Sequence, residues 1–197
     1  MLIWGSSWLA IHFQLGEVAP EASIAYRFIL ASGLLVIWCR LRGISLRIAL
    51  HHHPFLVLLG LSLFSLNYLL FYYAAFELAT GLLAVIFSTM TVMNIFNSAL
   101  FLRRQIQKKT VLAVVFGLTG MALVFWPEIT TSGPQVATAI GISLIATYLA
   151  SIGNIVSARN QNHGLPVASA NAIGMAYGAL FMLAYSAGSG VPFMIDT

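Results

Sequence analysis

Arg27 carries a charge inside an apolar stretch, and its chemistry needs an explanation. It stands about one and a half turns into the hydrophobic run 22–41. Inserting a charge into a bilayer costs at least roughly 2.5 kcal/mol, so such a residue normally pairs or lines a water-filled cavity. Because a guanidinium group matches carboxylate and phosphate geometry, Arg27 could be the counter-ion of a substrate anion. The alternative is an arginine that snorkels to the interface or bonds carbonyls of neighbouring helices.

Polar side chains recur at intervals of three or four residues in three further apolar runs, which places each set on one helix face. The sets are Ser65, Tyr68 and Tyr72; Thr91, Asn94 and Ser98; and Thr147, Ser151 and Asn154. The three faces could line one substrate cavity, to which Asn94, deep in its run, would bring a full amide. The alternative is that these groups hydrogen-bond across helix interfaces, where each contributes about 0.6 kcal/mol on average.

Two other places could contribute to a substrate site. Trp4, Trp8 and His12 share one helix face, and an aromatic floor there would bind an organic or cationic substrate by cation–π contact. The alternative is that the tryptophans belong to the aromatic belt at the membrane interface. Asn171 opens the apolar run 167–188, and it is equally open to substrate binding or packing.

The sequence offers little for catalysis or metal binding. His51 to His53 are adjacent and do not face one another on a helix, and no carboxylate or cysteine nearby completes a metal shell. Paired carboxylates, an HExxH motif and a Ser–His pair within reach are not visible. Cys39 is the single cysteine and is expected to pack. We therefore expect no enzyme, no metal and no cofactor.

The composition predicts the elements that hold these residues. Apolar residues make up 60% of the chain and charged residues 7%, against roughly 45 to 50% and 25% in soluble domains. So few charged residues cannot cover a water-exposed surface, which predicts an all-α, polytopic membrane bundle of about seven transmembrane helices. The expected helices are 1–16, 22–41, 54–76, 78–102, 110–126, 137–157 and 167–188.

The charges between these helices predict an orientation. If the helices alternate, eight of the nine basic residues fall on one side, which should be cytoplasmic, and all five acidic residues fall in connections on the other. The N-terminus is then expected in the cytoplasm, with the protein in a bacterial-type inner membrane. Because the basic residues sit in short connecting segments, no nucleic-acid partner is expected.

A weak internal repeat suggests a pseudosymmetric fold. Setting Pro20 on Pro166, an offset of 146 residues, aligns Ala22 with Ala168 and Ser23 with Ser169. Five spans separate the two copies, so the second copy would enter the membrane from the opposite side. Inverted repeats of this kind are typical of secondary transporters.

The chain resembles the EamA-type transporters of the drug/metabolite transporter superfamily. The resemblance lies in "WGSSWLAIHF", "PEASIAYRFILASGLL" and "GLTGMALVFWP". It implies ten helices in two units, with a first repeat at 1–127 and the start of a second at 137–197, so the chain is expected to lack three helices. Arg27 matches the arginine that the family keeps in its second helix. The chain has "FSTMTVMNIF" where family members usually carry a proline in the fourth helix.

The resemblance implies a secondary transporter of small organic metabolites, such as amino acids, that works by alternating access. The alternatives are an inactive truncated fragment or a membrane-embedded enzyme. Small residues at 113, 117 and 120, and Gly174 with Gly178, predict close helix packing and leave a homodimer open. The expected partners are a small-molecule substrate and the lipid bilayer.

Overall fold

The computed structural model describes residues 19–131 and 134–189, and the described residues form helices without any strand. In chain order the elements are α2 (Pro20–Leu41), η1 (Leu50–His52), α3 (His53–Leu61), η2 (Ser62–Leu66), α4 (Asn67–Ala75), α5 (Thr80–Ser88), α6 (Met90–Leu102), α7 (Lys108–Thr131), α8 (Pro134–Asn162) and α9 (Val167–Ser189). The all-helical prediction is confirmed.

Five helical segments of the described chain are long and apolar enough to cross a membrane. They are Pro20–Leu41, Leu50–Ala75, Thr80–Leu102, Pro134–Asn162 and Val167–Ser189. Each coincides with a predicted helix, and α7 matches the predicted helix 110–126. The predicted helix 1–16, with Trp4, Trp8 and His12, lies outside the described residues. The prediction of about seven spans is thus partly confirmed.

Two helices run further than predicted. α7 continues through Pro127 to Thr131, and α8 covers 29 residues from Pro134 to Asn162, where 137–157 was expected. A proline lacks an amide hydrogen and normally ends or kinks a helix. The expected connection Pro127–Pro134 is therefore wrong at both ends, because Pro127 lies inside α7 and Pro134 begins α8.

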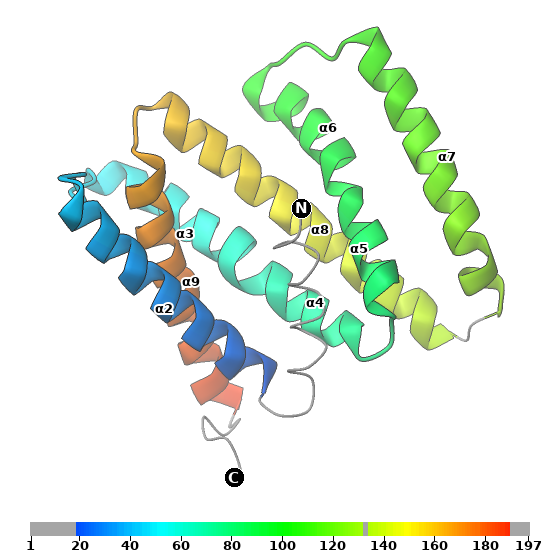
Figure 1. The fold of residues 1–197 in the computed structure, drawn as a ribbon, viewed down its shortest axis with the longest axis horizontal. Coiled ribbons are helices and arrows are strands. Elements are labelled where there is room, and N and C mark those ends of the chain that lie inside the picture. Colours follow the sequence, from blue (N-terminus) through cyan, green and yellow to red (C-terminus); the bar gives the residue numbers. More distant parts are fainter. Residues whose placement is uncertain (1–18, 132–133, 190–197) are drawn as a thin grey trace.

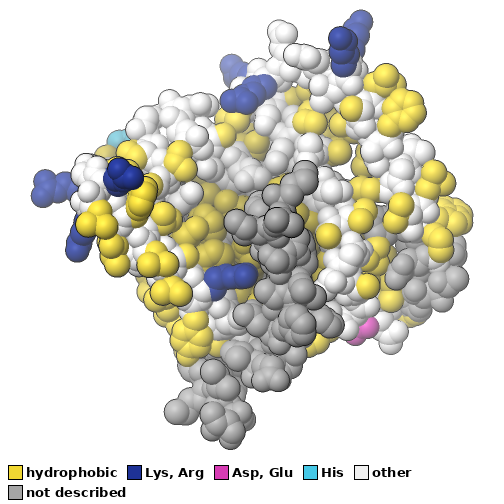
Figure 2. All heavy atoms as spheres, viewed as in Figure 1, with side chains coloured by type: hydrophobic (Ala, Val, Ile, Leu, Met, Phe, Trp, Pro, Cys, Tyr) yellow, Lys and Arg dark blue, Asp and Glu magenta, His cyan; other side chains and the backbone are white. Residues whose placement is uncertain are grey.

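When α7 is counted with the five membrane-length segments, successive segments run in alternating directions, so the connections 42–49, 103–107 and 163–166 lie at one end of the bundle (Figure 1). We call this the basic end, because eight of the nine basic residues lie in these connections or in the adjoining helix turns. Figure 2 shows Lys and Arg side chains gathered there on the visible face. The connection 76–79, with Glu77, lies at the opposite end.

Glycines bring α9 against α3. A Cβ atom on Gly60 of α3 would lie 2.5 Å from the Gly174 carbonyl oxygen and 2.8 Å from the Gly178 nitrogen. One on Gly178 would lie 2.9 Å from the Gly60 carbonyl oxygen. The predicted role of Gly174 and Gly178 in close helix packing is confirmed. Nothing lies within 4 Å of a Cβ built on Gly117 or Gly120 of α7, whose role stays a prediction.

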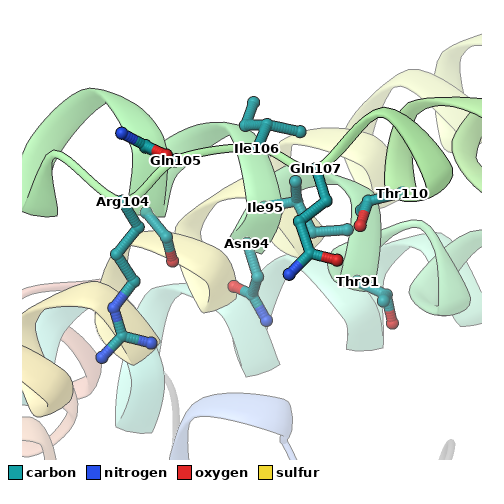
Figure 3. Close-up of a pocket in the computed structure, with 9 residues that line it drawn as sticks. Thr91, Asn94, Ile95, Arg104, Gln105, Ile106, Gln107 and Thr110 are labelled. Carbon is teal, nitrogen blue, oxygen red and sulfur yellow. The ribbon is translucent and has the colours of Figure 1, made fainter.

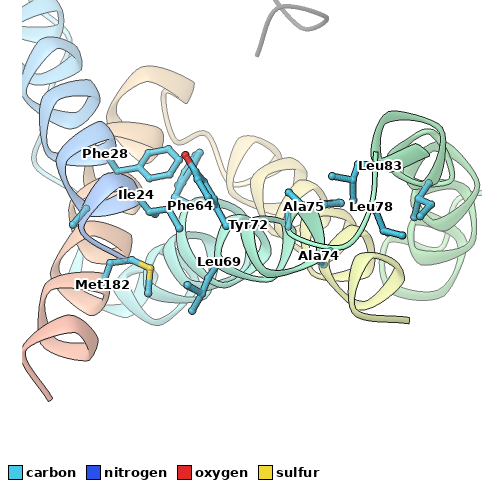
Figure 4. Packing of buried hydrophobic residues seen from close by; sticks show 14 of the residues in the cluster. Ile24, Phe28, Phe64, Leu69, Tyr72, Ala74, Ala75, Leu78, Leu83 and Met182 are labelled. Carbon is cyan, nitrogen blue, oxygen red and sulfur yellow. The ribbon is translucent and has the colours of Figure 1, made fainter. Parts of the chain in front are cut away.

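The apolar core lies where α2, α4 and α9 meet, and it extends to α5 (Figure 4). Ile24 and Phe28 of α2 pack in one cluster with Phe64, Tyr72 and Met182. α2 also packs along the length of α9, while α8 lies against α3, α4, α5 and α6. Helices from the two ends of the chain are therefore packed together.

Two membrane-length segments are irregular. η2 is a π-helical stretch inside the segment Leu50–Ala75, and such stretches are often found at functional sites. The segment Thr80–Leu102 is interrupted at Thr89, without a proline. There the Ser88 and Thr89 hydroxyls each donate a 2.6 Å hydrogen bond to a carbonyl three residues earlier. Such local bonding competes with the helix and explains the interruption.

Candidate functional site

Arg27 and Tyr68 face one another across α2 and α4. The Arg27 guanidinium carbon lies 5.5 Å from the centroid of the Tyr68 ring, which is cation–π distance. Tyr68 packs edge-on against Phe28, at 5.1 Å between ring centroids, and this contact holds the ring in place. Arg27 is half-buried, and it forms no ion pair with any residue that the structure describes. Its charge is thus placed against an aromatic face, without a described protein anion to neutralise it.

One helix turn away, a second pair extends this contact. The hydroxyl oxygens of Ser23 on α2 and Tyr72 on α4 lie 3.4 Å apart, and Tyr72 is 2% exposed. α2 and α4 run in opposite directions, so residues four apart on each helix meet in reverse order. We call Ser23, Arg27, Tyr68 and Tyr72 the Arg27 cluster. It brings together three residues of the predicted site and adds Ser23.

Glu21 lies within a span, whereas the sequence interpretation put every acidic residue in a connection. It is the second residue of α2, is 5% exposed, and accepts a 2.6 Å hydrogen bond from the Tyr73 hydroxyl. The prediction was wrong because α2 begins at Pro20 rather than at residue 22. A proline at the first helical position followed by an acidic residue is a helix-start signal that would have placed it correctly.

The polar face Thr91, Asn94 and Ser98 lines a pocket between α6, the connection 103–107 and the start of α7 (Figure 3). Its volume is about 450 Å³. The other lining residues are Ile95, Arg104, Gln105, Ile106, Gln107 and Thr110. The Asn94 side-chain oxygen is buried and has no hydrogen-bond partner among the described residues. No member of the Arg27 cluster lines this pocket, so the described residues hold the predicted site residues in two separate places.

The third polar face is engaged with α6. Asn97 donates a 2.8 Å hydrogen bond from its amide to the Ser151 hydroxyl, and both residues are buried. The Asn154 amide lies 3.4 Å from the Met90 sulfur. Sequence reasoning missed Asn97, although a second amide near Asn94 in the same helix was the available signal. These contacts agree with the packing interpretation, and a substrate role for Asn154 stays a prediction.

Ser65 of η2 and Asn171 of α9 are two further predicted positions. Ser65 donates to the backbone oxygens of Gly60 and Leu61, at 3.1 and 3.0 Å. Asn171 is half-buried on α9, near the basic end. Substrate binding by Asn171 stays a prediction, and Trp8 lies outside the described residues.

The histidine run lies at the basic end. His53 forms a 2.6 Å hydrogen bond with the Tyr177 hydroxyl, and the His51 and His52 rings lie 4.0 Å apart. Within the described ranges, no group of three or more His, Cys, Asp or Glu residues could hold a metal ion. His53 therefore ties α3 to α9, which is a packing role.

Comparison with known proteins identifies the family. The model of the EamA-like transporter family matches residues 1–126, nearly two thirds of the chain. The chain belongs to the EamA-like transporter family. The matched residues include the Arg27 cluster and the whole pocket beside α6. With its membrane-length apolar helices, this EamA-family chain is an integral membrane protein.

Two curated relatives are similar to it. Protein PagO of Salmonella typhimurium is 26% identical over 131 residues, which cover 66% of this chain and 43% of PagO. An uncharacterized transporter of Buchnera aphidicola is 25% identical over 105 residues, covering 53% of this chain and 35% of that protein. The chain therefore aligns with less than half of either relative. No solved structure matches it significantly.

Proposed function

We propose that this EamA-family chain acts in secondary transport of small organic metabolites that carry an anionic group, such as amino acids. Arg27 supports this proposal most directly. It is a charge within an apolar span, it is half-buried, and it has no ionic partner among the described residues. A charge held in this way is a functional candidate, since charged residues within membrane spans commonly mark substrate or ion pathways.

In the proposed site, Arg27 is the counter-ion of the substrate carboxylate or phosphate. Tyr68 fixes the direction of the guanidinium group through the cation–π contact, and the Ser23 and Tyr72 hydroxyls lie one turn away. Such a site combines one charge with a few polar groups in apolar surroundings, as small-molecule sites do. Trp8, Asn154 and Asn171 are further proposed contributors, whereas Thr91 and Asn94 line the separate pocket beside α6.

Alternating access is the proposed mechanism. Residues 1–127 would form the first unit, and residues 137–197 would begin an inverted second unit. The packing of α9 along α2, and of α8 along α4 and α6, fits this assignment, because both helices that carry the Arg27 cluster contact the proposed second unit. The basic end is proposed to face the cytoplasm, with the protein in an inner membrane.

Uptake into proteoliposomes that contain the full chain tests the proposal. Labelled amino acids and organic acids would be compared for wild type, Arg27→Ala and Arg27→Lys. Arg42→Ala is the matched control, because Arg42 also lies over an aromatic ring, 4.7 Å from the Trp38 centroid, but at the basic end. We expect Arg27→Ala to abolish uptake, Arg27→Lys to retain part of it, and Arg42→Ala to leave it unchanged. Equal uptake by wild type and Arg27→Ala would refute the role of Arg27, and no uptake by wild type would refute transport by this chain.

A further inference from the structure

We propose that the pocket beside α6 binds a ligand that joins an oxyanion to neighbouring hydroxyl groups, as a glycerol phosphate does. The headgroup of an anionic phospholipid and a free phosphorylated metabolite both supply this chemistry. The site is distinct from the Arg27 cluster, and its occupancy does not depend on the proposed transport function. Its volume of about 450 Å³ lies within the usual range for small-molecule pockets.

The charges around the pocket select an anion. Arg104 is the charged residue among the described lining residues, which include no carboxylate. Arg103, Lys108 and Lys109 stand in the same segment of chain and add to the positive potential without lining the pocket. A guanidinium group offers paired donors that fit phosphate or carboxylate oxygens.

The neutral lining selects hydroxyl groups on the same ligand. Asn94, Gln105 and Gln107 contribute amides, which can both donate and accept hydrogen bonds, and Thr110 contributes a hydroxyl (Figure 3). The buried Asn94 oxygen has no partner in the described structure, and an unpaired buried acceptor is unfavourable. Because the Asn94 side chain lines the pocket, a ligand hydroxyl that enters beside it could bond its amide.

Packing does not explain the polar residues of this face. α6 meets α8 through Asn97, which is bonded to Ser151, whereas Asn94 lines the pocket. Thr91 is exposed. In the described structure, Asn97 is thus the polar residue of α6 that bonds to α8. The polar side chains of Thr91, Asn94 and Ser98 line the pocket instead.

Binding measurements on the purified full chain test this site with two probes. Native mass spectrometry would count phosphatidylglycerol retained from mixed phosphatidylglycerol and phosphatidylcholine nanodiscs, and calorimetric titration would measure glycerol 3-phosphate. Arg104→Gln is the test variant, and Arg103→Gln is its matched control. We expect Arg104→Gln to weaken binding by about tenfold or more, because a charged hydrogen-bonding partner is lost, and Arg103→Gln to weaken it far less, because Arg103 does not line the pocket.

Each outcome bears on the proposal. Arg104-dependent retention of phosphatidylglycerol alone assigns the site to lipid, and Arg104-dependent binding of glycerol 3-phosphate assigns it to a soluble ligand. The proposal is overturned if wild type binds neither probe, or if Arg103→Gln weakens binding as much as Arg104→Gln. If Arg104→Gln does not fold, Asn94→Asp decides, since a carboxylate in the pocket should repel the oxyanion and unchanged binding would contradict the site. Loss of binding in Arg27→Ala but not in Arg104→Gln would place the probe at the Arg27 cluster and overturn the proposal.

Discussion

Gly60 of α3 should not tolerate even one added methyl group. A Cβ atom there would lie 2.5 Å and 2.8 Å from backbone atoms of Gly174 and Gly178, which cannot rotate away as a side chain can. Overpacking a tight core typically costs about 1–3 kcal/mol, and these backbone contacts put Gly60→Ala at the upper end. The higher helix propensity of alanine offsets this cost by up to about 1 kcal/mol. We therefore expect Gly60→Ala to lower the free energy of unfolding by about 2 kcal/mol.

Unfolding by SDS titration, followed by circular dichroism, measures this change. Gly117→Ala is the control, because nothing lies within 4 Å of its added Cβ, so it should be neutral or stabilise by up to about 1 kcal/mol. Gly174→Ala should fall between the two, since its nearest contact, at 3.0 Å, is the end of the flexible Leu59 side chain. If Gly60→Ala and Gly117→Ala unfold at the same SDS concentration, the close approach of α3 and α9 is wrong.

Three further predictions concern the polar contacts and the orientation. Tyr73→Phe should destabilise the protein by about 1–3 kcal/mol, because it leaves the buried Glu21 carboxylate without its hydrogen-bond donor. Tyr148→Phe, at an exposed position, should not destabilise it. SDS unfolding that fails to separate the two variants would contradict this prediction. A double-mutant cycle on Asn97→Ala and Ser151→Ala should give a coupling of about 0.6–1.7 kcal/mol, and additive effects would show that their bond does not contribute. In intact cells, a membrane-impermeant maleimide should label Ala79→Cys but not Arg47→Cys, with native Cys39 buried and unreactive; the reverse pattern would invert the proposed orientation.

Helix positions were predictable because long apolar runs and loop charges reflect the bilayer directly. α2, α9 and the segment Thr80–Leu102 lie within two residues of the predicted bounds. Helix ends marked by proline were harder, because Pro127 is accommodated inside α7 and Pro134 begins α8. A break at Thr89 and a π-helical turn at Ser62–Leu66 depend on local hydroxyl bonds and packing, which helical periodicity does not encode.

The candidate site was predictable in part. The charge of Arg27 inside an apolar run was visible in the sequence, but its aromatic partner depended on how α2 and α4 pair. Helical spacing placed Thr91, Asn94 and Ser98 on one face, yet could not tell whether that face meets α8 or the connection 103–107. Asn97 takes the place against α8, and only tertiary packing decides between the two asparagines.

Competition between a substrate acid and its neutral amide tests the central claim most directly, because it isolates the charge that Arg27 is proposed to bind. In proteoliposomes with the wild-type chain, an amino acid should inhibit uptake of its labelled form far better than the corresponding carboxamide, which lacks the anionic group. In Arg27→Lys, which keeps the charge but loses the paired donors, the preference should shrink without disappearing. Equal inhibition by acid and amide in the wild-type chain would contradict the assignment of Arg27 as the substrate's counter-ion.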